Sequence, residues 1–493
     1  MEGEEFRAAS QEMTDFIVKY LDNIRERRVL PEVTPGYLRP LLPPAAPDAP
    51  ETWRDVMNDI ERVIMPGVTH WHSPQFHAYF PTGNSYPSIL ADMLSDAIGC
   101  IGFTWIASPA CTELEVVMMD WLGQLLGLPE QFLAASGGQG GGVIQGTASE
   151  ATLVALLSAK AKKLSDLTSS GTTTTTTSSN TTSDDQRRVT DQLKKEHSCK
   201  LVAYCSDQAH SSVERACMLG GVEVRKVDSD EDFAMRGPAL RKRVLEDLKN
   251  KMVPFLVVST MGATPACSFD NLREIGEVAK EFDLWNHVDA AYAGSALICE
   301  EFRGLSDGIE LANSFNFNPH KWFLINFDCS AMWFKDAREV VDAFNVDPLY
   351  LKHEHQGAVP DYRHWQIPLG RRFRSLKLWF VMRLYGKEGL QAHIRKQVSL
   401  AHRFEDRVKS DQRFEIILPV TLGLVCFRLK GQSNEVNEEL YKKINNGGVI
   451  HLVPSKIRDV YFLRLAVCSR QTEEKDIDLA WREVLKQTEA LLQ

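Results

Sequence analysis

The sequence predicts an α/β protein: a mostly parallel sheet flanked by helices, preceded by a helical arm and followed by a small α+β domain. Its 493 residues exceed what one hydrophobic core usually serves. Apolar strand-like segments and amphipathic helical segments alternate from about Gly140 to Trp333, and long helical patterns with short strands follow Leu376. We therefore divide the chain into an arm (1–85), a large domain (86–376) and a small C-terminal domain (377–493).

The composition excludes several classes of protein. With 44% hydrophobic and 25% charged residues, it is that of an ordinary globular protein. A net charge of -10 argues against nucleic-acid binding. The acidic start and the absence of an unbroken apolar run predict a cytoplasmic protein with no membrane partner. Ten cysteines without a Cys-x-x-Cys pair indicate reduced packing thiols, and no metal site is expected.

The first segment predicts an amphipathic helix on an arm. Apolar residues recur at helical spacing from Phe6, namely Met13, Phe16, Ile17, Tyr20, Leu21 and Ile24. The proline-rich stretch from Pro31 to Pro50 predicts an extended connector. Since such arms commonly pack on a second protomer, we expect an obligate homodimer.

The central region predicts repeated strand and helix units. Strands are expected at 201–204, 222–227, 255–258 and 285–288, and helices at 211–219, 238–248 and 272–282. Ligands of such sheets bind beyond the carboxyl ends of the strands. The tract Thr168–Asp185, with six consecutive threonines, predicts a disordered surface insertion with no catalytic role.

A glycine-rich segment leads into a predicted helix start. Gly140–Gly142 precede Thr147, which with Glu150 fits a capping box. Free N–H groups at such a helix start favour a phosphate. A glycine-rich turn that only caps a helix explains the same residues, so this motif alone does not decide between them.

Two further segments carry candidate catalytic groups. Asp289 ends an apolar strand, where a carboxylate is costly unless a cation or hydrogen bonds compensate. Lys321 lies among aromatics and asparagines, where an amine loses its proton readily and attacks carbonyls. A helix cap and a surface lysine are the structural alternatives. Together with the phosphate cradle, however, an acid and a lysine are the three attachments that pyridoxal phosphate requires.

Dense motifs extend this pattern over nearly the whole chain. They are His77–Pro81, Ser108–Glu115, Ser206–Ser212 and Asn318–Lys321. On these motifs the sequence resembles the group II pyridoxal-phosphate decarboxylases of the fold-type I transferase superfamily, in the branch that acts on aromatic amino acids. The Thr-rich tract departs from that pattern.

The resemblance implies roles for the cofactor residues. Lys321 would hold pyridoxal 5'-phosphate as an internal aldimine, and Asp289 would keep its ring nitrogen protonated. His210 and Ala291 would stack on the two faces of the ring, and Thr260 would position the ring oxygen. The phosphate ligands would be Ala148, Ser149, Ser314 and Asn318. His320 would contact both cofactor and substrate, and His210 also faces the substrate.

The resemblance also assigns a catalytic loop. Tyr350 lies in a polar segment without sustained periodicity, and its phenol would protonate the carbanionic carbon. Without the resemblance, Tyr350 would read as an ordinary surface tyrosine. The pairs His70-x-His72 and His353-x-His355 lack further ligands, so we expect no metal there.

The substrate pocket implied by the resemblance is aromatic. It would contain Trp71, Tyr79, Phe80 and Thr82, with Ile101 and Phe103 from the other subunit. Gly370 would leave room for a catechol or indole, where histidine decarboxylases carry serine. The adjacent Arg371, Arg372 and Arg374 indicate structural ion pairs rather than a nucleic-acid patch.

The implied activity is that of an aromatic-amino-acid decarboxylase, a carboxy-lyase. It would convert dopa, 5-hydroxytryptophan, tyrosine or tryptophan to the amine and CO2, as in catecholamine biosynthesis. The alternatives are an aromatic aldehyde synthase, a histidine decarboxylase and a silent cofactor-binding scaffold. In aldehyde synthases the loop phenol or the stacking histidine is typically replaced, whereas Tyr350 and His210 are both present.

Overall fold

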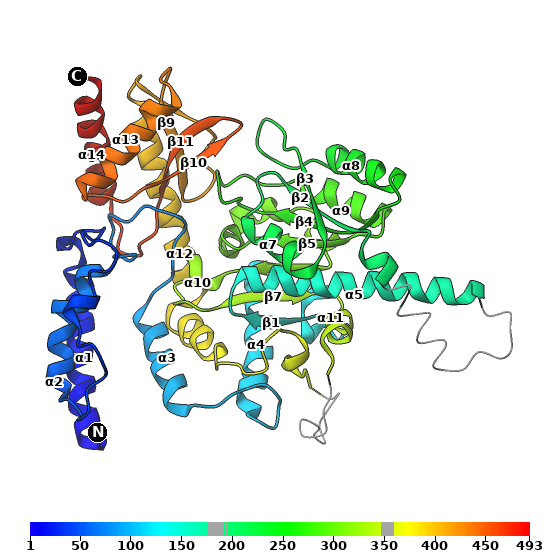
Figure 1. The fold of residues 1–493 in the computed structure, drawn as a ribbon, viewed down its shortest axis with the longest axis horizontal. Coiled ribbons are helices and arrows are strands. Elements are labelled where there is room, and N and C mark those ends of the chain that lie inside the picture. The colour runs from blue at the N-terminus through cyan, green and yellow to red at the C-terminus, as the bar shows by residue number, and fades with distance from the viewer. Residues whose placement is uncertain (176–191, 193–194, 347–358) are drawn as a thin grey trace. The chain divides into compact units, whose positions relative to one another are not determined.

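The computed structural model describes residues 1–175, 192, 195–346 and 359–493 (Figure 1). The chain forms two compact units, one of residues 1–82 and 397–493 and the other of residues 83–396. The arm and the carboxyl-terminal segment thus share a unit, whereas the sequence was divided into three parts at 85 and 376. Among the helices of the described residues, none combines the length and apolarity needed to cross a membrane.

A seven-stranded sheet organises the unit 83–396, in the order β1-β7-β6-β5-β4-β2-β3 (Figure 1). The strands are β1 (Gly141–Gln145), β2 (Leu201–Ser206), β3 (Glu223–Val227), β4 (Val253–Thr260), β5 (Trp285–Asp289), β6 (Ser314–Phe317) and β7 (Ser330–Phe334). Only β7 is antiparallel to its neighbours, β1 and β6. The predicted mostly parallel α/β sheet is confirmed.

Helices cover both faces of this sheet because its strands are apolar on both sides. In β2, Val202 and Tyr204 pack into one buried cluster with helices α8 (Gly237–Lys249) and α9 (Leu272–Glu281). The alternate residues Leu201, Ala203 and Cys205 pack into the cluster on the other face. This period of two is the geometry of a strand buried on both faces.

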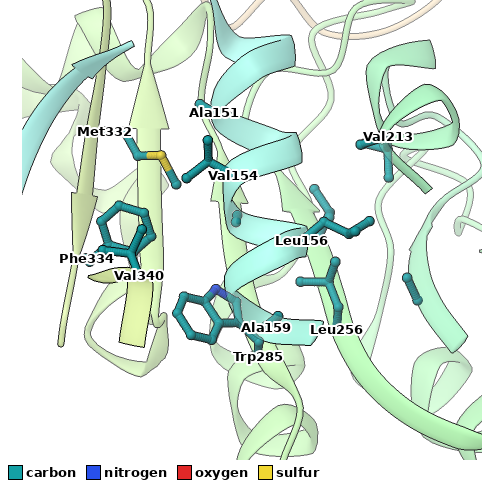
Figure 2. Packing of buried hydrophobic residues seen from close by; sticks show 14 of the residues in the cluster. Ala151, Val154, Leu156, Ala159, Val213, Leu256, Trp285, Met332, Phe334 and Val340 are labelled. Carbon is teal, nitrogen blue, oxygen red and sulfur yellow. The ribbon is translucent and has the colours of Figure 1, made fainter. Parts of the chain in front are cut away.

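Helix α5 (Ala148–Thr175) dominates the second face, together with α7 (Ser211–Gly220) and α11 (Ala337–Phe344). Figure 2 shows Ala151 and Val154 of α5 on the side of Met332 of β7, and Leu156 of α5 on the side of Leu256 of β4. The helix continues through Thr175, so residues 168–175 of the tract predicted to be disordered are helical. Residues 176–185 of that tract lie outside the described residues.

The remaining helices of this unit are α3 (Tyr86–Ile98), α4 (Pro109–Leu126), the short α10 (Pro319–Trp322) and the first part of α12 (Ser375–Lys409), which continues into the other unit. Short helical turns are η5 (Glu130–Phe132), η6 (Ala134–Ser136), η7 (Ala293–Ile298), η8 (Glu300–Ser306), η9 (Ile309–Leu311) and η11 (Tyr362–His364).

The unit of residues 1–82 and 397–493 contains an antiparallel sheet in the order β10-β11-β9-β8. Its strands are β8 (Phe414–Ile416), β9 (Leu424–Leu429), β10 (Val453–Ile457) and β11 (Val460–Ala466), and its helices are α1 (Gly3–Asp22), α2 (Trp53–Asp59), α13 (Asn434–Gly447) and α14 (Glu474–Leu492). Its short helical turns are η1 (Ile24–Glu26), η2 (Arg39–Leu41), η3 (Ile60–Ile64) and η4 (Met65–Gly67). Arg25 joins the two segments, because its guanidinium donates to the Asp476 carboxylate over 3.0 Å. The predicted opening helix is confirmed as α1.

Candidate active site

Three neighbouring strands end level with one another at the carboxyl edge of the large sheet. Thr260 of β4 pairs with Asp289 of β5, and Asp289 pairs with Asn316 of β6. Two residues after Asn316, the Asn318 N–H donates to the Ala291 carbonyl over 3.0 Å, and α10 begins at Pro319. Lys321 therefore lies on a short helix directly beyond the edge that carries Asp289.

The start of α5 lies at the same edge. Gln145, the last residue of β1, pairs with Ser330 of β7, and Phe317 of β6 pairs with the adjacent Ala331. The ends of β1 and β6 are thus level on either side of β7. With strands about 4.8 Å apart, the first turn of α5 begins about 10 Å from the strand that leads into Lys321.

The first turn of α5 is capped in a way that leaves two N–H groups for a ligand. The Thr147 hydroxyl accepts from the Glu150 N–H (3.2 Å), and the Thr147 carbonyl accepts from Ala151 (3.0 Å). The Glu150 carboxylate reaches back to the Gly146 N–H (3.0 Å). The N–H groups of Ala148 and Ser149 remain, which a helix start cannot bond internally. They form an anion site at the positive end of the helix.

Three ionisable groups interact at this edge. Burial lowers the pKa of Lys321, and the negative charge of Asp289 opposes that shift. Burial likewise lowers the pKa of His210, where Asp289 again opposes the shift and Lys321 adds to it. Asp289 is buried and accepts the Ala291 N–H over 3.0 Å. The edge therefore holds an amine that loses its proton more readily than a surface lysine.

His210 is held by the helix that it caps. Its Nδ1 accepts the Ser212 N–H over 3.1 Å at the start of α7 and lies 2.8 Å from the Ser212 hydroxyl. Because Nδ1 accepts, the proton of the neutral ring lies on Nε2. The side chain remains exposed at the edge of the sheet, so its ring can cover a flat ligand.

Several buried polar atoms at this edge have no hydrogen-bond partner among the described residues, and two of them matter here. These two are the Thr260 hydroxyl oxygen and the Asn318 side-chain oxygen, on residues 5% and 3% exposed. Buried polar groups are rarely left unpaired, so they favour a polar ligand at this place. An anion site, an amine, a carboxylate and two unpaired polar atoms fit the expected pyridoxal phosphate.

His320 is buried and neutral. Its Nδ1 accepts the Cys329 N–H over 2.8 Å, and burial lowers its pKa to about 3. The ring packs 4.7 Å from that of Phe327. The proton therefore lies on Nε2, which is able to donate to a ligand.

Ser314 is the one predicted phosphate ligand that the structure places elsewhere. It lies level with His287, two residues before Asn316 and away from the carboxyl edge. Its oxygen lies 2.8 Å from both the Trp285 ring nitrogen and His287 Nδ1. The side chain is fully buried and already bonded, so it is not placed to bind a phosphate at this edge.

Asp270 was not singled out from the sequence, yet it holds the end of β4. Its carboxylate accepts the N–H groups of Thr260 (2.8 Å) and Met235 (2.7 Å), and its own N–H donates to the Thr260 carbonyl (3.0 Å). Burial raises its pKa to about 7. Its only signal in the sequence is an acidic residue just before a predicted helix, which is common at helix starts.

The predicted substrate residues fall in both units. Trp71 and Tyr79, in the unit 1–82 and 397–493, stack with ring centroids 5.2 Å apart. In the same unit, the Phe80 ring lies under the Arg464 guanidinium, and Thr82 is the last residue of the segment.

The other unit holds the residues predicted to reach a second subunit. Ile101 lies beside Gly370, because a Cβ built on Gly370 would be 3.5 Å from an Ile101 methyl. Phe103 follows in the same loop and is half-buried. The structure thus brings together Ile101 and Gly370, two residues predicted for the pocket that are far apart in the sequence.

The arginine cluster forms ion pairs, as predicted. Arg371 and Glu115 are buried and 2.7 Å apart, and Glu115 also accepts the Ile144 N–H of β1 over 2.7 Å. Arg372 and Arg374 both pair with Asp328. Through Glu115, the cluster therefore stabilises β1, the strand that leads into α5.

Tyr350 and the pair His353-x-His355 lie outside the described residues. In the other pair, His70 Nδ1 lies 2.9 Å from the Tyr20 hydroxyl. Within the described ranges, no three His, Cys, Asp or Glu side chains gather as a metal site requires.

Comparison with known proteins agrees with this geometry. The family model of the pyridoxal-dependent decarboxylase conserved domain matches residues 35–430. An aromatic-L-amino-acid decarboxylase of Drosophila melanogaster is 64% identical over 486 residues, covering 98% of this chain and 91% of that protein.

Two solved structures are similar over the full length. The Oryza sativa TDC with PLP and tryptamine has a TM-score of 0.92 and 35% identity, covering 100% of this chain and 99% of its own. The Rhodiola rosea 4-hydroxyphenylacetaldehyde synthase has a TM-score of 0.89 and 36% identity, with 100% of both chains covered.

Proposed function

The chain belongs to the pyridoxal-dependent decarboxylase family, and from that membership we propose that it decarboxylates aromatic L-amino acids to their amines with pyridoxal 5'-phosphate. One observation carries the proposal at the level of the site. Thr260, Asp289 and the segment Asn318–Lys321 share the carboxyl edge to which the first turn of α5 also points. The substrates that we expect are dopa, 5-hydroxytryptophan, tyrosine and tryptophan.

When bound, pyridoxal phosphate supplies a conjugated ring that accepts the electron pair left at the α carbon as CO2 departs. Lys321 is the group that we assign to its aldehyde carbon, because burial makes this amine a readier nucleophile. Asp289 is assigned to the ring nitrogen, where its carboxylate would hold a proton in place. Lys321 and Asp289 thus supply the nucleophile and the electrostatic stabilisation.

The surrounding residues bind and orient. The N–H groups of Ala148 and Ser149 are assigned to the phosphate, together with Asn318. The exposed ring of His210 is assigned to one face of the cofactor and Ala291 to the other. Thr260 and His320 each carry a polar atom for the ring oxygen or the substrate, and Tyr350 is assigned as the proton donor to the α carbon.

We also propose a homodimer. Helix α3 exposes Leu90, Met93 and Ile98, although isolated chains rarely expose so many neighbouring apolar residues. Phe6 on α1 is 55% exposed and belongs to the apolar face of the predicted arm. In the three-part division of the chain, we assign the dimer contacts to residues 1–85 and cofactor binding to residues 86–376. The ten cysteines without a Cys-x-x-Cys pair support a cytoplasmic enzyme, and dopa as a substrate would make it an enzyme of catecholamine biosynthesis.

The proposal is tested by measuring products and oxygen uptake together. Protein loaded with pyridoxal phosphate is incubated with dopa, 5-hydroxytryptophan, tyrosine, tryptophan and histidine, and amine, aldehyde and peroxide are quantified. We expect amine from the catechol and indole substrates without oxygen consumption, and none from histidine. Aldehyde with stoichiometric peroxide would mean an aldehyde synthase, whose fold is the same. Histamine as the main product would mean a histidine decarboxylase.

Tyr350→Phe tests the proton donor. Without the phenol, protonation of the α carbon slows and the carbanion stays open to oxygen. We expect the product to shift from amine toward aldehyde and peroxide, measured in the same assay. Tyr385→Phe, on a helix of the described region, is the matched control and should leave the ratio unchanged. An unaltered amine yield in Tyr350→Phe would remove this residue from the mechanism.

A further inference from the structure

Two cysteines at the ends of one loop lie with their sulfurs in contact. Cys100 comes two residues after the end of α3, and Cys111 lies in the first turn of α4. Their Sγ atoms are 3.1 Å apart. A disulfide needs about 2.05 Å, so a bond requires an approach of only about 1 Å.

The chain around the pair is shaped for this contact. A Cβ added at Gly102 would lie 2.7 Å from the Cys111 Cβ and 3.2 Å from its sulfur, so only glycine lets the segment pass so close. The Gly102 N–H donates to the Arg371 carbonyl over 3.2 Å, which holds the segment against α4. The proximity of the two thiols is therefore built into the packing.

The two thiols differ in access. Cys100 is half-buried, whereas Cys111 is 6% exposed and packs in a cluster with Phe373 and Leu376. Burial raises the pKa of the Cys111 thiol to about 12. Cys100 is thus the thiol that a reagent in solution reaches first, and Cys111 is the thiol that reacts second.

The loop between them carries two of the proposed substrate residues. Ile101 and Phe103 lie within residues 100–111, and the Ile101 methyl lies beside Gly370. Ile101 directly follows Cys100 in the chain, so any backbone shift that closes the bond would move it. The pair therefore closes the loop that carries two residues assigned to the aromatic pocket.

We propose that Cys100 and Cys111 are a reversible oxidation site for low-molecular-weight disulfides, and that closing the bond weakens binding of the aromatic substrate. The second half rests on the proposed function, through Ile101 and Phe103. The first half concerns only the two thiols.

The exchange balances without any other reactant. The Cys100 thiolate attacks the small disulfide, whose S–S bond breaks; a mixed disulfide forms, and one small thiol leaves with a proton. The Cys111 thiolate then attacks the Cys100 sulfur, and the second small thiol leaves with a proton. Two protein thiols are oxidised and one small disulfide is reduced to two thiols. Because the second step needs the Cys111 thiolate, closure should be faster at higher pH.

The experiment treats the holoenzyme with glutathione disulfide, alkylates the remaining thiols and cleaves after glutamate. Cleavage after Glu61 and Glu113 releases residues 62–113, whose only cysteines are Cys100 and Cys111. We expect this peptide to lose two hydrogen masses and to escape alkylation, and dithiothreitol to reverse both effects. Cys100→Ser should abolish the change, whereas the control Cys199→Ser, at an exposed thiol, should leave it intact.

The substrate effect is measured on the same samples. KM for the aromatic amino acid should rise severalfold on oxidation, return with dithiothreitol, and stay constant in Cys100→Ser. A peptide 62–113 that remains reduced, or that stops at glutathionylated Cys100, overturns the site. A closed disulfide with unchanged KM overturns the coupling alone. If the protein lacks decarboxylase activity, the peptide masses still decide the first half.

Discussion

At the scale of single residues, the environment of Asp289 determines what it can do. The side chain is 4% exposed, and its carboxylate accepts the Ala291 N–H of its own turn over 3.0 Å. A buried carboxylate that interacts electrostatically with the Lys321 amine and the His210 ring is suited to stabilise positive charge on a ligand. The role of Asp289 is therefore tested by removing its charge while keeping the shape of its side chain.

Asp289→Asn should keep the fold, since the amide oxygen still accepts the Ala291 N–H. Removing the charge should lower kcat about 10²–10³-fold, the range found when one electrostatic stabiliser is lost. Steady-state kinetics of cofactor-loaded protein measure this. Asp283→Asn, at an exposed carboxylate that pairs with Lys163, is the control and should keep kcat. A kcat within twofold of the parent in Asp289→Asn would contradict the role.

At the scale of elements, the start of α5 joins folding to ligand binding. The same turn contains the Thr147 cap and the two N–H groups assigned to the phosphate. Small residues such as Ala151 and Ala159 then allow the helix to lie close on the sheet (Figure 2). The cap therefore fixes the direction of the N–H groups as well as the end of the helix.

Thr147→Ala should lower the free energy of unfolding by about 1 kcal/mol, the usual value for a lost cap. It should also weaken the binding of pyridoxal phosphate. Urea unfolding gives the first quantity, and titration of the apoprotein by absorbance gives the second. Ser433→Ala removes an equivalent cap from α13, where the Ser433 hydroxyl accepts the Val436 N–H. That control should lose similar stability but keep its cofactor affinity. If the two variants bind pyridoxal phosphate with equal affinity, the Thr147 cap does not contribute to the phosphate site.

At the scale of the whole molecule, buried histidines make folding sensitive to acid. Burial lowers the pKa of His77, His287 and His451 to about 4 in the folded protein. In the unfolded chain these rings take up a proton near pH 6.5. Between these values the unfolded state binds more protons, so the stability that these histidines contribute falls as pH drops from about 6.5 toward 4. Above pH 6.5 their contribution is constant. The raised pKa of Asp270 acts in the opposite sense.

His451→Gln isolates one of these contributions. In the part of the chain that the structure describes, Nδ1 of His451 is buried without a hydrogen-bond partner, so the substitution breaks no side-chain hydrogen bond there. Lowering the pH from 7.5 to 5.5 should cost the parent about 1 kcal/mol more than the variant, because one ionisation is removed. Free energies from urea unfolding at the two pH values measure the difference. Identical pH dependence in the two proteins would contradict the assignment.

Much of the fold follows from local patterns in the sequence. The strand ending at Asp289, the helix after Thr147 and the helix α1 are each set by apolar periodicity or a capping residue within a few positions. The chemistry of Lys321 and Asp289 could likewise be predicted, because an isolated lysine and acid in apolar surroundings are costly without a function. The roles of Tyr350 and the pocket residues came from the family resemblance and stay predictions.

The tertiary structure decided what depends on pairing between distant segments. The resemblance implied Ser314 as a phosphate ligand, but the register with β5 places it level with His287. Likewise, only packing brings Ile101 to Gly370 and Cys100 to Cys111. Sequence by itself determined the elements with strong local patterns, such as α1, β2 and β5, because those preferences are local. Which side chains meet was decided by strand register and close packing, which join residues far apart in the chain.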